Sequence, residues 1–182
     1  MMHETITNQI TVTSDRFVLR PPQASDAGLL NMYAADRNLA RGTRSIAHPL
    51  PPGSIEAMIS RARQPERSED VWVMDGSTAG HAEVLGVISL TRMDRAQSEV
   101  FYWVAPAFWN IGFATEAVKA LLSANPHKAE RYFAEAFQDN PGSARVLTNC
   151  GFDYLGDAEA FSVARNAAVP TWTYTLKVPS AP

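Results

Sequence analysis

The sequence has little of several features that mark particular classes of protein. It contains one cysteine, Cys150, so no disulfide can form within the chain and nothing favours a secreted, disulfide-stabilised fold. No segment approaches the roughly 20 apolar residues that a membrane-spanning helix needs. Residues 1–16 have neither the basic flank nor the apolar stretch of a signal peptide. We therefore expect a cytosolic protein with no membrane partner.

Positive charge is also scarce. The chain has 16 Lys and Arg against 19 Asp and Glu, a net charge of -3, which argues against nucleic acid as a partner. The histidines show no metal-ligand spacing, so we predict no metal site. Neither a GxGxxG pattern nor the Lys-Ser/Thr of a P-loop is present, which disfavours ATP and dinucleotides as ligands.

The 182 residues, 46% of them hydrophobic, suit one folded domain over residues 1–182. The segments are ordered strand, two helices, three strands, helix, strand, helix and two strands, which indicates an α/β fold with helices packed on one mixed sheet. Residues 38–52 and 157–170 are expected to be loops. The former is rich in Gly and Pro, and the latter lies between the two final strands.

The segment PAFWNIGFATEAVKALL, residues 106–122, raises a functional question. Its helix is expected to begin near Thr115 and to end at Asn125, before Pro126. The first N–H groups of a helix have no internal partner and carry partial positive charge, so they can bind an anion where no side chain blocks the approach. Gly112 and Ala114 leave that space. A plain strand-to-helix turn would need the same small residues, and the local sequence leaves both possibilities open.

Two segments together resemble a known family. YWVAPAFWNIGFATEA (102–117) and DNPGSARVLTNCGF (139–152) resemble the GNAT superfamily of acetyl-CoA-dependent N-acetyltransferases. The similarity is greatest to the branch that contains the ribosomal-protein-alanine N-acetyltransferases, and it extends from about residue 16 to residue 176. It implies an α/β fold with a mixed, mostly antiparallel central sheet of six to seven strands, a splayed strand pair and helices on both faces.

The resemblance also implies where acetyl-CoA would bind. The pyrophosphate would lie on the turn and helix start, and the pantetheine arm between the splayed strands, where it would add to the sheet by main-chain hydrogen bonds. Asn140 would hold this arm or cap its helix, and Arg145 would face a phosphate or solvent. The residues implied to bind the cofactor are Trp103, Val104, Trp109, Asn110, Ile111, Gly112, Phe113, Ala114, Thr115, Asn140 and Arg145.

Two residues are candidates for catalysis. Glu99 lies on the strand that leads to the turn, where the family often has a glutamate base; alternation places it on one face with Phe101 and Trp103. The alternative is an edge glutamate that faces solvent. Ser143 could donate a hydrogen bond to the departing thiolate, or simply cap its helix. The position where many relatives carry a tyrosine acid is Leu147 here.

The implied activity is transfer of an acetyl group from acetyl-CoA to a primary amine by direct attack in a ternary complex. The acceptor would be a protein N-terminus or a small-molecule amine, and residues 38–52 and 157–170 would line its pocket. A homodimer is compatible with the resemblance. The alternative is a non-catalytic acyl-CoA-binding or sensor domain, which the missing tyrosine keeps open.

Overall fold

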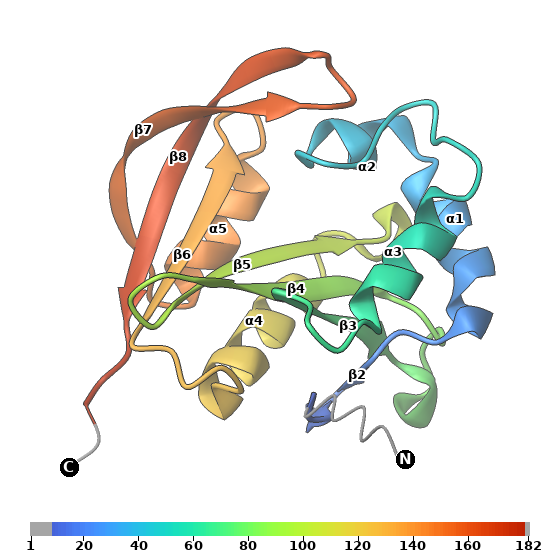
Figure 1. Cartoon of the computed structure of the whole chain (residues 1–182), viewed down its shortest axis with the longest axis horizontal. Helices are drawn as coiled ribbons and strands as arrows, with labels where there is room; N and C mark the ends of the chain where they lie inside the picture. The colour runs from blue at the N-terminus through green and yellow to red at the C-terminus, as the bar shows by residue number, and fades with distance from the viewer. Residues whose placement is uncertain (1–8, 181–182) are drawn as a thin grey trace.

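The computed structural model describes residues 9–180 of the chain (Figure 1). No helix in this range is long and apolar enough to cross a membrane. In chain order, the strands and helices are β1 (Val12–Thr13), β2 (Val18–Arg20), η1 (Ala24–Asp26), α1 (Ala27–Ala34), α2 (Arg37–Arg41), α3 (Ser54–Ala62), β3 (Glu69–Asp75), η2 (Ser77–Ala79), β4 (Gly86–Met93), β5 (Gln97–Val104), η3 (Pro106–Phe108), α4 (Phe113–Ala124), β6 (Arg131–Phe137), α5 (Pro141–Asn149), β7 (Asp153–Ser162) and β8 (Ala167–Lys177).

The described strands form an 8-stranded sheet in the order β1-β2-β3-β4-β5-β6-β8-β7. Neighbouring strands run antiparallel except β5 and β6, which are parallel. The predicted mixed, mostly antiparallel sheet is therefore confirmed. The additional strand is β1, whose two residues pair with β2 and are too few to show an alternating pattern.

The segment 157–170, expected to be a loop, is mostly strand. β7 and β8 stay paired out to Ser162 and Ala167, so only residues 163–166 form the turn. The outer half of this hairpin extends past the end of β6 and arches towards α2 (Figure 1). Most of its side chains are exposed. With no core behind it, the segment needs no alternation of apolar and polar residues, and backbone pairing alone makes it a strand.

The other predicted loop, 38–52, overlaps a short helix. α2 begins after Asp36, whose side chain accepts a hydrogen bond from the Leu39 N–H at 2.9 Å and caps the helix. Leu39 and Ala40 are buried. A helix of five residues is too short to show the periodicity on which the prediction depends.

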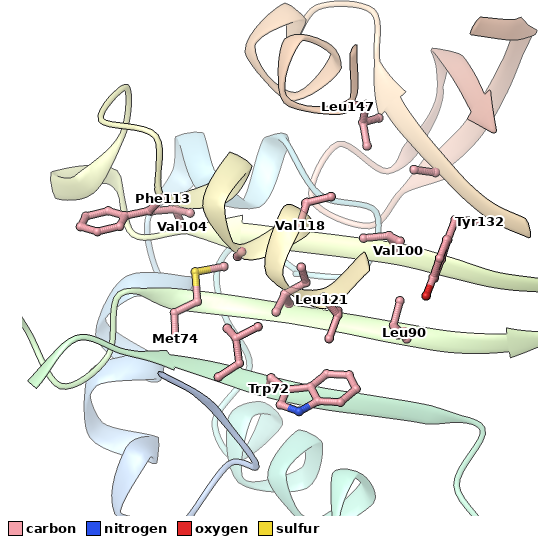
Figure 2. Close-up of a cluster of buried hydrophobic side chains, with 14 of the residues drawn as sticks. Trp72, Met74, Leu90, Val100, Val104, Phe113, Val118, Leu121, Tyr132 and Leu147 are labelled. Carbon is pink, nitrogen blue, oxygen red and sulfur yellow. The ribbon is translucent and has the colours of Figure 1, made fainter. Parts of the chain in front are cut away.

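Apolar clusters lie on both faces of the sheet, and Figure 2 shows part of the larger one. β3 contributes to both, because its alternate residues Trp72 and Met74 face one cluster while Val71 and Val73 face the other. In the larger cluster α4 and α5 bury Phe113, Ala117, Val118, Leu121, Ala144 and Leu147. On the opposite face α1, α2 and α3 bury Leu30, Ala34, Leu39, Ile55, Ile59 and Ala62. Helices on both faces are thus confirmed.

The parallel pair β5 and β6 separates partway along its length. The two strands pair over only three residues, from Gln97 with Arg131 to Glu99 with Phe133. Beyond that point β5 continues to pair with β4, and β6 with β8, but not with each other. The predicted splayed pair is present, and one backbone edge of β5 from Val100 onwards is left unpaired by β6.

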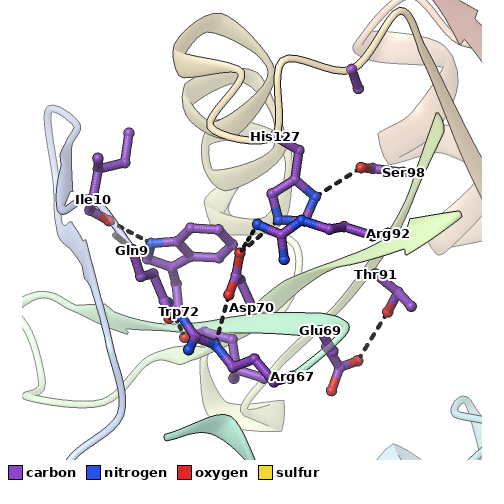
Figure 3. Close-up of polar contacts among 12 residues, drawn as sticks. Gln9, Ile10, Arg67, Glu69, Asp70, Trp72, Thr91, Arg92, Ser98 and His127 are labelled. Atoms are coloured by element: carbon purple, nitrogen blue, oxygen red, sulfur yellow. Dashed lines mark hydrogen bonds and ion pairs between the residues drawn. The ribbon is translucent and has the colours of Figure 1, made fainter. Parts of the chain in front are cut away.

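A buried polar network lies near the closed end of this pair (Figure 3). His127, in the connection between α4 and β6, donates from Nε2 to Asp70 of β3 at 2.6 Å, and its Nδ1 lies 2.8 Å from the Ser98 hydroxyl of β5. Asp70 also pairs with Arg67 at 2.7 Å and Arg92 at 3.3 Å. The network therefore connects the segment before β6 to strands β3 and β5.

Candidate active site

The turn before α4 has a backbone that requires glycine. Gly112 is the N-cap of α4 and has a φ of 87°, in the left-handed region that disfavours other residues. A Cβ at this position would lie 3.3 Å from the Arg16 guanidinium. α4 begins at Phe113, slightly before the predicted start. The first N–H groups of this helix therefore open onto the turn, where no side chain covers them at Gly112.

Arg16 holds this turn in place, a role that no local pattern in the sequence predicts. Its Nε and backbone N–H donate to the Glu116 carboxylate at 2.6 and 3.0 Å, and its Nη1 donates to the Ile111 carbonyl at 2.9 Å. Ser14 also donates to Glu116. Burial alone would raise the pKa of Glu116, but the hydrogen bonds from Arg16 and Ser14 outweigh it and lower that pKa. The turn is thus fixed from outside while its inner side stays free.

A cleft of about 710 Å³ runs from this turn along β5 to the start of α5. It contains all but one of the residues implied to bind the cofactor. Those lining it are Trp103, Val104, Trp109, Asn110, Gly112, Phe113, Ala114, Thr115, Asn140 and Arg145, together with Ser143. Ile111 lies outside the cleft with its side chain 52% exposed. The structure thus gathers segments about 30 residues apart in sequence around one elongated space.

One main-chain group in the cleft is already occupied. The Trp109 indole N–H donates to the Val104 carbonyl at 2.6 Å, which fixes the turn against the end of β5. Trp103 and Val104 were both expected to offer main-chain contacts to the pantetheine arm. The backbone edge of β5 from Val100 to Trp103 is not paired with β6, so its main-chain groups remain able to bond a ligand.

A smaller hollow continues from the cleft towards the face covered by α1 to α3. The two share Gly42, Tyr102 and Ser143, and we call this meeting point the joint. The Tyr102 hydroxyl donates to the Ser143 carbonyl at 2.8 Å and lies 3.1 Å from the Ser143 hydroxyl. Tyr102 was not among the predicted site residues. Burial raises its pKa, so the hydroxyl remains protonated at neutral pH.

Glu99 lies on the same face of the sheet as the smaller hollow but lines neither cavity. Its carboxylate is paired with the guanidinium of Arg44, which also reaches Glu135 of β6 at 3.3 Å. Thr171 donates to the other oxygen of Glu135 at 2.9 Å. Arg44 and Glu135 were missed by the sequence analysis, because only the tertiary fold brings residues 44, 99 and 135 together.

The tip of the β7–β8 hairpin closes one side of the cleft. Arg165 donates from Nη2 to the Arg41 carbonyl at 2.7 Å and pairs with Asp139, so it links α2 to the start of α5. The Asp139 carboxylate raises the pKa of Arg165. Within residues 9–180, no three His, Cys, Asp or Glu side chains are grouped so that they could hold a metal ion.

The sequence matches the family described as Acetyltransferase (GNAT) domain over residues 16–153, which is more than half of the chain. The chain belongs to the GNAT acetyltransferase family. The predicted family and the predicted class of enzyme, an acetyl-CoA-dependent N-acetyltransferase, are thereby confirmed. No curated protein sequence matches the chain.

Several solved structures share the fold of this chain. RimJ from Mycobacterium smegmatis, in complex with a coenzyme A disulfide, has a TM-score of 0.76 at 19% identity over 97% of this chain and 90% of that one. Ribosomal-protein-S5-alanine acetyltransferase from Vibrio fischeri has a TM-score of 0.72 at 18% identity, over 93% and 97%. Spermidine N-acetyltransferase from Vibrio cholerae, in complex with coenzyme A and spermine, has a TM-score of 0.71 at 16% identity, over 87% and 94%.

Proposed function

We propose that residues 1–182 form one acetyltransferase domain that transfers an acetyl group from acetyl-CoA to a primary amine by direct attack in a ternary complex. The observation that carries this proposal is the continuity of the cleft. It connects a helix N-terminus suited to an anion with the joint at Tyr102 and Ser143, along the edge of β5 that β6 leaves unpaired.

Each part of acetyl-CoA has a suitable counterpart in the cleft. The pyrophosphate would lie on the backbone N–H groups at the start of α4, beside Gly112 and Ala114, and Arg145 would add a positive charge. The pantetheine arm would follow β5 from Trp103 towards Val100, with the Asn140 amide on its other side. The thioester would then reach the joint, where the cleft opens to the smaller hollow.

The amine would approach from the smaller hollow and attack the thioester carbonyl. Its nitrogen lone pair forms the C–N bond, and the electrons of the C–S bond leave with the sulfur. The proton lost by the nitrogen passes through water to the Glu99 carboxylate, which lies outside the lining of the smaller hollow and must first be released by Arg44. The thiolate accepts a hydrogen bond from Ser143 and takes its proton from solvent. The acetyl group thus ends on the amine nitrogen, and the proton that the nitrogen loses ends on Glu99.

The acceptor class is broader than any one relative suggests. Similar structures include one named as an alpha-N-protein acetyltransferase of ribosomal L7/L12 and one named as a spermidine N-acetyltransferase, whose acceptors are a protein α-amine and a small-molecule polyamine. Both are primary amines, and a neutral amine is the form that attacks. We therefore propose a primary amine of either kind as acceptor. The cytosolic location and a homodimer stay predictions.

One alternative is supported by a specific observation. Glu99 is paired with Arg44, and Leu147 replaces the tyrosine acid of many relatives, so a domain that binds acyl-CoA without turnover would have the same cleft. Such a domain would serve as a sensor of acyl-CoA.

Incubation with acetyl-CoA and a panel of peptides and small amines, with release of thiol followed over time, separates the two. We expect at least one amine to give sustained thiol release above the rate without amine, and we expect Glu99→Gln to lower that rate by about 100-fold. Binding of acetyl-CoA without thiol release across the panel, in both proteins, would favour the sensor. Absence of acetyl-CoA binding would overturn both functions.

A further inference from the structure

The joint between the two hollows contains a pair of hydroxyl groups, and the family resemblance assigned a role to only one of them, that of Ser143. Tyr102 comes from β5 and Ser143 from the first turn of α5, so the pair spans the two walls of the cleft. The Tyr102 hydroxyl is in contact with both oxygens of Ser143, at 2.8 Å from the carbonyl and 3.1 Å from the hydroxyl. This contact fixes the start of α5 relative to the strand along which the cleft runs.

The other hydroxyl groups that line the two hollows have other hydrogen-bond partners or lie away from the joint. Thr43 donates to the Ala40 carbonyl at 3.0 Å, and Thr171 donates to Glu135 at 2.9 Å. Thr115 lies in the first turn of α4, at the other end of the cleft. Among the described residues that line these hollows, Tyr102 and Ser143 are therefore the hydroxyl pair at the joint.

The direction of the hydrogen bonds gives the two residues different tasks. Tyr102 has one proton, and the nearby Ser143 carbonyl accepts it at the shorter distance, which leaves the phenol oxygen free to accept from the Ser143 hydroxyl. The Ser143 hydroxyl is then held in one orientation, with its proton directed at the phenol oxygen and its lone pairs free at the joint. Because burial keeps Tyr102 protonated, it can hold Ser143 without ionising.

We propose that Tyr102 is a positioning residue for acetyl transfer: its hydroxyl holds the Ser143 hydroxyl at the joint, where Ser143 donates a hydrogen bond to the departing thiolate. This inference rests on the proposed function. When the C–S bond breaks, its electron pair stays on sulfur and the Ser143 O–H turns to the thiolate. The Tyr102 O–H then turns from the Ser143 carbonyl to the Ser143 hydroxyl oxygen, so Tyr102 still holds that hydroxyl. Ser143 and Tyr102 keep their own protons, and the thiolate is finally protonated from solvent. Tyr102 thus supplies from the strand part of what a tyrosine at position 147 would supply from the helix.

The test compares Tyr102→Phe, Ser143→Ala and the double variant at saturating acetyl-CoA. We expect Tyr102→Phe to lower kcat roughly 10-fold with little change in the KM for acetyl-CoA, because one hydrogen bond that acts on the leaving group is lost. The double variant should be no slower than Ser143→Ala alone, because Tyr102 acts through Ser143. A kcat within twofold of wild type, or defects that multiply in the double variant, would overturn the proposal.

Tyr132→Phe is the matched control. Tyr132 is a buried tyrosine on the neighbouring strand β6, whose hydroxyl donates to Asn125 and which lines neither hollow. Its loss should lower the melting temperature and leave kcat unchanged. If Tyr132→Phe lowers kcat as much as Tyr102→Phe does, the effect of Tyr102 is one of general packing and the proposal fails.

A second measurement does not depend on turnover. The thiolate of bound coenzyme A absorbs in the ultraviolet, so its fraction can be followed as the pH is raised. We expect a thiolate fraction about tenfold larger in wild type than in Tyr102→Phe or Ser143→Ala at the same pH. If no amine is acetylated but this difference is found, the proposed function fails and the role of the hydroxyl pair stands. Equal fractions in all three proteins would overturn the role of Tyr102, and failure to bind coenzyme A would overturn both.

Discussion

Arg44 stands between the two carboxylates on the acceptor side of the sheet. Its guanidinium contacts Glu99 of β5 and Glu135 of β6, and its side chain is 38% exposed. Its backbone is held in place, because the Val163 N–H donates to the Arg44 carbonyl at 3.0 Å. The side chain can therefore leave the carboxylates by a change of rotamer while the backbone stays fixed. An ammonium that approached Glu99 would compete with this guanidinium.

Replacement of Arg44 by Gln should strengthen binding of the acceptor. With the competing cation removed, we expect the KM for the amine to fall roughly fivefold, equivalent to ~1 kcal/mol, and the KM for acetyl-CoA to stay unchanged. Steady-state kinetics with each substrate varied in turn measure both constants. Arg44→Lys keeps a positive charge and should stay close to wild type. An unchanged or higher KM for the amine in Arg44→Gln would show that Arg44 does not compete with it.

At the scale of elements, the site depends on how α4 begins and how β5 and β6 separate. Gly112 gives α4 an uncovered N-terminus, Arg16 holds the turn from outside, and the Trp109 indole fixes it to the end of β5. The two strands separate after Glu99 and Phe133, which leaves a backbone edge of β5 facing the cleft. The anion site and the open edge are thus parts of one strand-turn-helix unit.

Gly112→Val should weaken cofactor binding more than it weakens the fold. The new side chain would have to adopt a left-handed backbone and would point towards Arg16 beside the helix start. We expect a loss of ~1–2 kcal/mol in the free energy of unfolding and a KM for acetyl-CoA at least roughly 10-fold higher, equivalent to ~1.4 kcal/mol. Thermal denaturation and initial-rate kinetics measure the two effects separately.

Gly80→Val is the control for this backbone effect. Gly80 has a φ of 79°, and a Cβ there would meet nothing within 4 Å. It lies outside both hollows. The control should lose a similar amount of stability and keep the KM for acetyl-CoA of wild type. A folded Gly112→Val protein with unaltered affinity for acetyl-CoA would mean that the turn has a structural role alone.

At the scale of the whole molecule, Asp70 is the charge at the centre of the buried polar network shown in Figure 3. Burial alone would raise its pKa, but the hydrogen bond from His127 and the charges of Arg67 and Arg92 outweigh burial and hold the pKa below its ordinary value of 3.8. The network joins β3 and β5 to the connection before β6, so it stabilises the closed end of the splayed pair.

Asp70→Asn should therefore destabilise the fold in a pH-dependent way. We expect a loss of about 3 kcal/mol at pH 7, because the variant leaves the buried guanidinium of Arg67 without its carboxylate partner. Since the folded-state pKa is lowered, the contribution of Asp70 is complete above its ordinary pKa and is lost as the pH falls through the folded value. Urea unfolding should show a large difference from wild type at pH 7 and a smaller one at pH 3, which is below the ordinary pKa of Asp70.

Asp94→Asn serves as the control, because Asp94 is exposed in the turn between β4 and β5. Its effect should stay within ~0.5 kcal/mol at both pH values. If the Asp70→Asn deficit is absent at pH 7, or does not shrink on acidification, the network does not stabilise the fold through the charge of Asp70.

Much of the fold could be predicted, because its signals are local. The strands β3 to β6 carry β-branched and aromatic runs, and Gly112, Pro126 and Gly151 mark the ends of the two long helices on one face. The errors fell where the local signal is weak. α2 is too short to show a helical period, and the outer half of the β7–β8 hairpin has no core to impose alternation.

By itself, the sequence determined the family, the mixed sheet and the position of the turn before α4, because short-range periodicity, breaker residues and two spaced motifs encode them. Only the tertiary structure decided the partners of the site residues. Arg44 reaches Glu99 across 55 residues of sequence, and Tyr102 reaches Ser143 across 41. Such contacts depend on where the sheet brings distant segments together. No local sequence pattern specifies which residues of those segments will meet.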